Sequence, residues 1–164
     1  MTTLAGSGSP GATDATGSAA SFNGTRGLVV DSSGNVYVAD VLSHKIRKIT
    51  PSGVVSSFAG SGTRESVDGV GTAATFNEPS ALTLDSAGNL YVGETGGHKI
   101  RKITPAGVVT TLVGSGATGS SNGTGSAASF NGPYALDVDS SGTLYVADTE
   151  NHLIRMVVQK SDSL

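Results

Sequence analysis

Short apolar runs recur along the chain, separated by turns rich in glycine and small polar residues. The first run, residues 28–30, has no polar alternation, which is typical of a strand buried on both faces. The Asp, Gly and Asn residues of segment 31–35 favour a hairpin turn after it. Runs at residues 36–39, 45–49 and 54–58 predict three more strands, the last preceded by a proline turn. The pattern therefore predicts a unit of four short antiparallel strands.

The whole unit recurs with a period of 54 residues, as the spacing of Phe22, Phe76 and Phe130 shows. A fixed period of this size is typical of solenoids, arrays and propellers. Four antiparallel strands in each unit fit a propeller blade, whereas an open solenoid of hairpins usually repeats faster and has capped ends. The same offset relates Asp31, Asp85 and Asp139, then Tyr37, Tyr91 and Tyr145, and then Ile46, Ile100 and Ile154.

The third unit contains the tripeptide Asn151-His152-Leu153, which names the NHL repeat. The other two units keep the histidine and the strand pattern but have Ser43 and Gly97 in place of the asparagine. Over nearly its whole length the chain resembles the NHL-repeat family of β-propellers. The resemblance implies an all-β fold in which residues 1–164 form a single repeat domain of three four-stranded blades. The predicted blades are residues 22–60, 76–114 and 130–158.

The two ends of the chain are offset by one strand. Residues 1–6 match the fourth strand of the first two units, so we expect an orphan outer strand there. The third unit lacks the proline turn and the valine pair, so its blade is predicted to lack an outer strand. Three blades do not easily close a ring, and the resemblance implies six. We therefore expect a six-bladed homodimer closed by strand exchange, with Thr3 and Leu4 of one chain beside Ile154 and Met156 of the other. An engineered or excised propeller fragment with no ligand is the alternative.

Composition narrows the classes of function. The chain has 24 glycines, no cysteine and a net charge of −3. The absence of cysteine excludes disulfides and thiolate metal sites. The net charge argues against nucleic acid and anionic membranes as partners, and we expect the basic residues of the third strands to form a solvated face. No signal peptide or membrane-length apolar run is visible, so the compartment stays unknown (cytoplasmic if the chain is complete).

Three long loops, residues 6–21, 60–75 and 114–129, connect the units or precede the first. Each ends in a Ser/Thr-Ala-Ala-Ser/Thr-Phe sequence, which predicts one capped helical turn that seats the phenylalanine. The polar residues that recur within these loops are Asp14, Asp68 and Asn122. A single recurring Asp or Asn in each loop falls short of the roughly six to eight oxygens that calcium needs. We therefore expect no cofactor here.

Each repeat places an acidic residue four positions before its histidine. We predict that this carboxylate hydrogen-bonds the imidazole and holds the loop, because a residue repeated in every blade is usually structural. Histidine is also a common zinc ligand, so a metal-assisted lyase or hydrolase stays open as the alternative function. The pairs are Asp40 with His44, Glu94 with His98, and Asp148 with His152.

Positions at which the three copies disagree are the candidate binding residues, although simple drift explains them equally well. The strand and loop order of a propeller places them around the pore on the loop-rich rim. These positions are Arg26, Ser80 and Tyr134, then Leu42, Gly96 and Glu150, and finally Asp137. No catalytic motif is present. We predict a non-catalytic scaffold that binds a protein, peptide or glycan on this rim.

Overall fold

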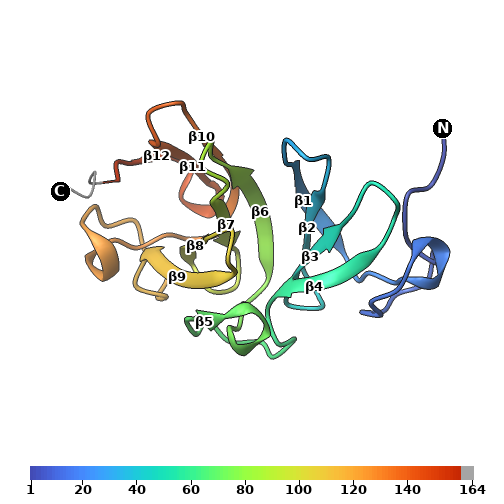
Figure 1. The fold of residues 1–164 in the computed structure, drawn as a ribbon. Helices are drawn as coiled ribbons and strands as arrows, with labels where there is room; N and C mark the ends of the chain where they lie inside the picture. The colour runs from blue at the N-terminus through green and yellow to red at the C-terminus, as the bar shows by residue number, and fades with distance from the viewer. Residues whose placement is uncertain (160–164) are drawn as a thin grey trace.

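The computed structural model describes residues 1–159 and is built from three antiparallel sheets that stand side by side (Figure 1). Blade 1 contains β1 (Thr25–Val30), β2 (Val36–Asp40), β3 (Lys45–Ile49) and β4 (Val55–Ala59). Blade 2 contains β6 (Pro79–Leu84), β7 (Leu90–Glu94), β8 (Lys99–Ile103) and β9 (Val108–Val113), with β5 (Gly69–Val70) added outside β9. Blade 3 contains β10 (Pro133–Val138), β11 (Leu144–Asp148) and β12 (Leu153–Val157). The predicted all-β, NHL-type blades are confirmed.

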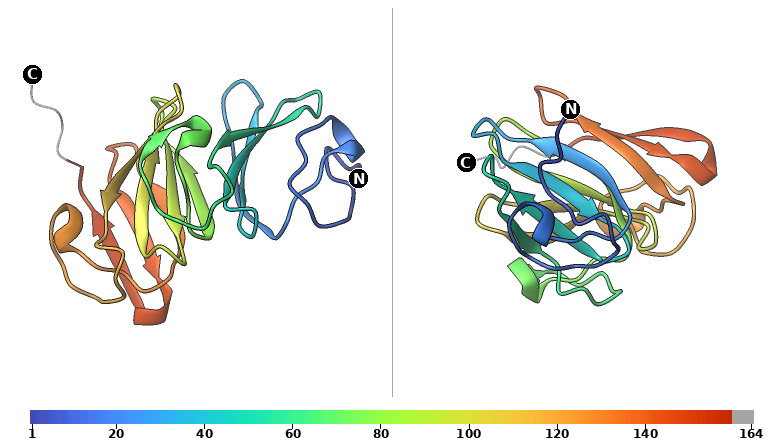
Figure 2. Two further views of the ribbon diagram at one scale, coloured as in Figure 1. Left: turned by 90° about the horizontal axis from the view of Figure 1, so that it is seen from below. Right: turned by 90° about the vertical axis from the view of Figure 1, so that its right-hand side faces the viewer.

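The first strands of the blades are neighbours: β6 packs between β1 and β10. Each blade therefore stacks face to face on the next, and the two ends of the described chain lie at opposite ends of the array (Figures 1 and 2). Within the described residues, no helix has the length and apolar character needed to cross a membrane.

The turn between the first two strands forms as the sequence predicts. Asp31 Oδ1 accepts the backbone N–H groups of Ser33 (2.9 Å) and Asn35 (2.8 Å). Gly34 has a φ of 81°, a conformation that costs glycine little. The same carboxylate turn recurs at Asp85 and Asp139.

The strand count differs from the prediction at the outer edges. Blade 2 has a fifth strand because the loop before it pairs with β9, Gly69 opposite Val109. Residues 1–6 form no strand in the single chain, since a strand needs a hydrogen-bonded neighbour. Among residues 1–159, nothing supplies a fourth strand to blade 3, whose sheet has the order β10-β11-β12.

Each long loop ends in the predicted helical turn, but the predicted side-chain cap is wrong. The turns are single 3₁₀ turns, η1 (Gly17–Ala19), η2 (Gly71–Ala73) and η3 (Gly125–Ala127), without a side-chain cap hydrogen bond. Each instead begins at a glycine with positive φ, which sets the turn through the backbone. A fourth turn, η4 (Thr149–Asn151), joins β11 to β12.

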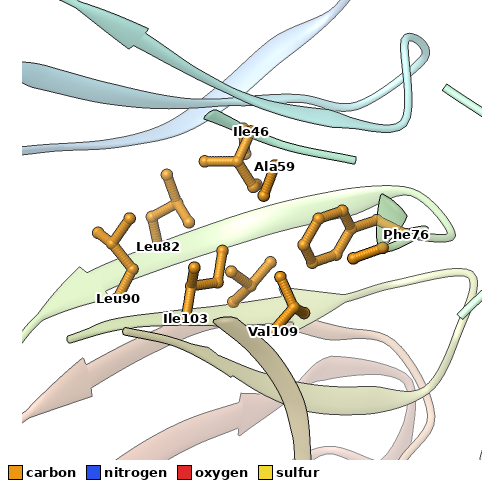
Figure 3. Close-up of a cluster of buried hydrophobic side chains, with 10 residues drawn as sticks. Ile46, Ala59, Phe76, Leu82, Leu90, Ile103 and Val109 are labelled. Carbon is orange, nitrogen blue, oxygen red and sulfur yellow. The ribbon is translucent and has the colours of Figure 1, made fainter. Parts of the chain in front are cut away.

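The core lies between the blades (Figure 3). Ile46 and Ala59 of blade 1 pack against Phe76 and Leu82 of blade 2, and blades 2 and 3 form an equivalent cluster. The prediction that the first strands are buried on both faces holds for β6 alone. Strands β1 and β10 consist mainly of exposed and partly buried positions, because each of these blades has a neighbour on one side only.

Candidate functional site

A buried arginine ties each long loop to its blade. Arg47 is fully buried, and its Nη1 donates to Asp40 Oδ2 (2.8 Å) and to the backbone oxygen of Ser21 (3.0 Å). Its Nη2 donates to Asp14 Oδ1 (2.6 Å), and the guanidinium lies 5.1 Å from the centre of the Phe22 ring. One side chain thus joins β2, β3, the loop and its aromatic anchor.

The same arrangement recurs in the other two blades. Arg101 is buried and donates to Glu94 Oε1 (3.0 Å) and Asp68 Oδ1 (2.8 Å). The sequence spacing repeats as well, since each arginine follows its strand acid by 7 residues and its loop partner by 33. In blade 3 the partners of Arg155 are Asp148 and Asn122. This repeated spacing could have revealed the network in the sequence.

These contacts correct one expectation and show what the loop acids do. The arginines of the third strands do not belong to a solvated face, because Arg47 and Arg101 are fully buried by their acidic partners and the loops. Asp14 and Asp68 are arginine partners. Burial works to raise the pKa of Asp14, but hydrogen bonds from Ser57 and Arg47 outweigh it and hold that pKa below its usual value.

The histidines of the first two blades bridge to the next blade. His44 Nδ1 accepts the backbone N–H of Glu78 (3.2 Å), and His98 Nδ1 accepts that of Gly132 (3.3 Å). All three histidines have a left-handed backbone, with φ between 53° and 56°, which is uncommon outside glycine but less so for histidine. His152 occupies the same position at the exposed end of blade 3, and the residue equivalent to Gly132 in the first blade is Gly24.

The predicted carboxylate–imidazole hydrogen bonds are wrong. In the part of the chain that the structure describes, the three acids bond to the arginines and to backbone N–H groups instead. Geometry explains the difference, because the acid ends a strand and points into its own blade while the histidine reaches the neighbour. Burial raises the pKa of Glu94, although Arg101 beside it opposes this rise. Among residues 1–159, no cluster of three or more potential metal ligands is present.

The His44 bridge predicts a pH-dependent stability. Burial lowers the pKa of His44, Arg64 adds to the lowering and Glu78 opposes it. The folded pKa therefore lies below the unfolded value near 6.5, so the stabilisation is complete above about pH 6.5 and is lost as the pH falls through the folded pKa. Melting temperatures between pH 7.5 and 5 should fall less steeply for His44→Asn than for the wild type. Parallel slopes would contradict a role for His44.

Two of the candidate positions on the first strands, Arg26 and Tyr134, lie close to each other. The Arg26 guanidinium of β1 sits 5.5 Å from the centre of the Tyr134 ring of β10. Asp137 Oδ1 accepts the hydroxyl of Thr83 (3.0 Å), which also joins two blades. Ser80 is buried, and its Oγ donates to the backbone oxygen of its own blade at Gly93 (3.5 Å). Arg26, Tyr134 and Asp137 are therefore exposed on the surface formed by the first strands, whereas Ser80 is buried beneath it.

The other three candidates lie in the connections between second and third strands. Each packs on the segment that enters its own blade: Leu42 beside Gly24, and Glu150 beside Gly132. A Cβ added to Gly96 would come within 2.5 Å of an Asn77 side-chain oxygen, so a larger residue there requires the Asn77 side chain to shift. Leu42 is 58% exposed. A pore-lining role for these three stays a prediction.

The two end faces of the array expose residues that are buried inside it. Ile46 and Ile100 are fully buried, whereas the equivalent Ile154 is 77% exposed. At the other end Leu28 of β1 is 60% exposed, whereas the equivalent Leu82 is 7% exposed. Repeat for repeat, the same apolar positions are covered in the middle of the chain and uncovered at its ends.

A groove of about 710 Å³ runs beside β12 at the edge of blade 3. It is lined by residues of β12, by Gln159, by the loop at residues 122–125 and by Leu112 and Phe130. In blades 1 and 2 the corresponding space between the third strand and the loop is filled by β4 and β9. The groove therefore lies where an outer strand would pair with β12.

An NHL repeat profile matches residues 130–155, which contain most of blade 3. The human NHL repeat-containing protein 2 is 36% identical to this chain over 137 residues. This chain is an NHL-repeat protein. The match covers 74% of the chain but only 18% of the human protein, so the chain corresponds to a small part of that relative.

Solved structures place these NHL repeats in a β-propeller. A Bacteroides thetaiotaomicron protein of unknown function superposes with a TM-score of 0.73 at 32% identity, over 79% of this chain and 34% of the other. An auxiliary nutrient binding protein from the same organism superposes with a TM-score of 0.71 at 26% identity, over 79% and 36%. The NHL-repeat chain described here therefore spans about a third of each of these propeller chains.

Proposed function

We propose that this NHL-repeat chain is a non-catalytic binding module that closes into a six-bladed ring with a second copy. The observation that carries the proposal is the exposure of Ile154, which is 77% exposed where Ile46 and Ile100 are fully buried. An apolar face of this kind favours association. Within the chain, the isoleucine at this position of the repeat is buried by the blade that follows.

The opposite end of the chain offers that surface. Ile46 is covered by Phe76 and Leu82 of blade 2. Their equivalents in blade 1 are Phe22, which is partly buried, and Leu28, which is 60% exposed. A second copy can therefore cover blade 3 with its own blade 1, and two such contacts related by a two-fold axis close the ring without an open face.

The loop-rich rim is the binding surface of this module. Arg26 of β1 and Tyr134 of β10 lie together although β6 packs between their strands, with the guanidinium 5.5 Å from the centre of the ring. Tyrosine and arginine are enriched among the residues that dominate binding energies, since they combine apolar area with directed hydrogen bonds. This pair supports a protein, peptide or glycan as the ligand. The shared fold alone does not decide between binding and catalysis, because one fold hosts many functions.

Solution mass tests ring closure. The wild type is expected at about twice 16.2 kDa by light scattering, and Ile154→Asp at the single-chain mass, because a carboxylate buried in the contact has no partner. Val67→Asp is the matched control: it makes the same kind of change at a side chain that is 52% exposed in the loop after blade 1, and should keep the wild-type mass.

A wild type that stays at the single-chain mass at micromolar to millimolar concentration would contradict the proposal and favour a propeller fragment. An unchanged mass for Ile154→Asp would contradict the contact itself. Circular dichroism of each variant establishes that the protein is folded before its mass is interpreted.

A further inference from the structure

The first residues of the chain already lie where an outer strand belongs. The backbone N–H of Gly6 donates to Gly17 O (3.0 Å). The matching bonds elsewhere are Gly60 to Gly71 (3.1 Å) and Gly114 to Gly125 (3.0 Å). Gly60 and Gly114 directly follow β4 and β9, the outer strands of the preceding blades. Residues 1–6 therefore relate to blade 1 as β4 relates to blade 2.

Among residues 1–159, no such strand fills the groove beside β12. Strand β12 is the edge of its sheet, so its outward N–H and C=O groups form a template for another strand. A single chain cannot fill this groove with its own residues 1–6, because the two ends of the described chain lie at opposite ends of the array (Figure 1).

Asn122 lines the groove, and among residues 1–159 its Oδ1 accepts one side-chain hydrogen bond, from Arg155 Nη2 (2.9 Å), so that it can accept one more. In blade 1 the equivalent Asp14 accepts both the backbone N–H (2.9 Å) and the hydroxyl (3.2 Å) of Ser57 on β4. In blade 2 Asp68 accepts the hydroxyl of Thr111 on β9 (2.9 Å). The residue at this position of the repeat in segment 1–6 is Thr3, which carries the same hydroxyl group.

We propose that the groove is a strand-accepting site for residues 1–6 of a second copy, with Asn122 receiving the Thr3 hydroxyl. The inference rests on the proposed ring and names the segment that seals it. The register follows from the pairs of β3 with β4, in which Ile46 faces Ala59, Arg47 faces Ser57 and Lys48 faces Ser56. The partner segment accordingly places Ala5 opposite Ile154, Thr3 opposite Arg155 and Thr2 opposite Met156.

A register-specific disulfide tests this site directly, because the chain contains no cysteine of its own. In Thr2→Cys/Met156→Cys the two sulfurs face each other across neighbouring strands, within the separation that a disulfide allows. Met156 is 63% exposed in the single chain, so the substitution leaves the core intact. Oxidation should convert most of the protein into a covalent dimer on a non-reducing gel.

The control is Thr3→Cys/Met156→Cys, whose side chains the register places on opposite faces of the sheet. It should give at least tenfold less covalent dimer under the same conditions. Each single-cysteine variant should also stay largely uncrosslinked. Before oxidation, Thr2→Cys/Met156→Cys should match the wild type in light-scattering mass and melting temperature. The control loses the Thr3 hydroxyl, so it is oxidised at a protein concentration at which light scattering gives it the same mass as the wild type.

The outcomes separate the two proposals. A non-covalent dimer that does not crosslink at residues 2 and 156, or crosslinks equally in the control, overturns the strand site and leaves the ring. A single-chain mass before oxidation overturns the ring and the strand site together. A crosslinked ladder beyond two chains supports the strand site but shows open head-to-tail chains, which overturns ring closure.

Discussion

Replacing Arg101 with methionine is expected to lower the free energy of unfolding by about 3–5 kcal/mol. Both Arg101 and Glu94 are fully buried and are joined by a 3.0 Å hydrogen bond. Removal of the guanidinium leaves the Glu94 carboxyl buried without its counter-charge and releases Asp68 in the loop. Equilibrium urea denaturation followed by circular dichroism measures the loss.

Arg64→Met is the matched control for this substitution. Arg64 also forms a salt bridge, with Glu78 (2.9 Å), but the two side chains are 63% and 32% exposed. An exposed pair of this kind contributes about 0–1 kcal/mol. The double variant Arg101→Met/Glu94→Leu should lose less stability than Arg101→Met, because no charge stays buried alone. Equal losses for Arg101→Met and Arg64→Met would show that burial of the pair does not matter.

Phe76→Ala is expected to lower the free energy of unfolding by about 3–5 kcal/mol, which is the usual cost of removing a buried phenylalanine ring. Phe76 is fully buried between blades 1 and 2, where its ring meets Ile46 and Ala59 (Figure 3). The ring also supports Arg101, whose guanidinium lies 5.4 Å from its centre. Urea denaturation at a protein concentration that keeps the chain monomeric gives this value.

Phe22→Ala makes the same change at the same position of the repeat, but on the end face of blade 1. Phe22 contacts its own blade and lacks a preceding blade in the single chain, so the substitution should cost less than Phe76→Ala. The difference between the two variants should shrink at concentrations where a second copy covers blade 1. A difference that does not depend on concentration would argue against that coverage.

Much of the fold follows from local sequence. The Asp31 turn, the strand at residues 45–49 and the helical turn before each phenylalanine all depend on neighbouring residues, and all are present. The period of 54 residues then places equivalent elements in equivalent blades. What the local pattern misses is β5, because its two residues pair with β9 through a long loop and carry no strand signal of their own.

The contacts of the charged residues were harder to predict. Asp40 and His44 are close in sequence and suggest a pair, yet Asp40 bonds to Arg47 in its own blade and His44 to the next blade at Glu78. Sequence distance does not show which side of a sheet a side chain faces after a turn with positive φ. The recurrence of arginine at a fixed distance from Asp14 was a visible signal, but long-range spacing becomes informative only once the blade geometry is known.

The stacking of one blade on the next occurs twice within a single chain, with the same apolar positions in each joint. The angle between adjacent sheets is therefore set by residues such as Ile46 and Phe76, far from any junction between copies. In a closed assembly that angle alone fixes how many chains complete the circle. The contacts between blades within one chain therefore determine the stoichiometry of the ring. The terminal strands stabilise an assembly whose size those contacts have set.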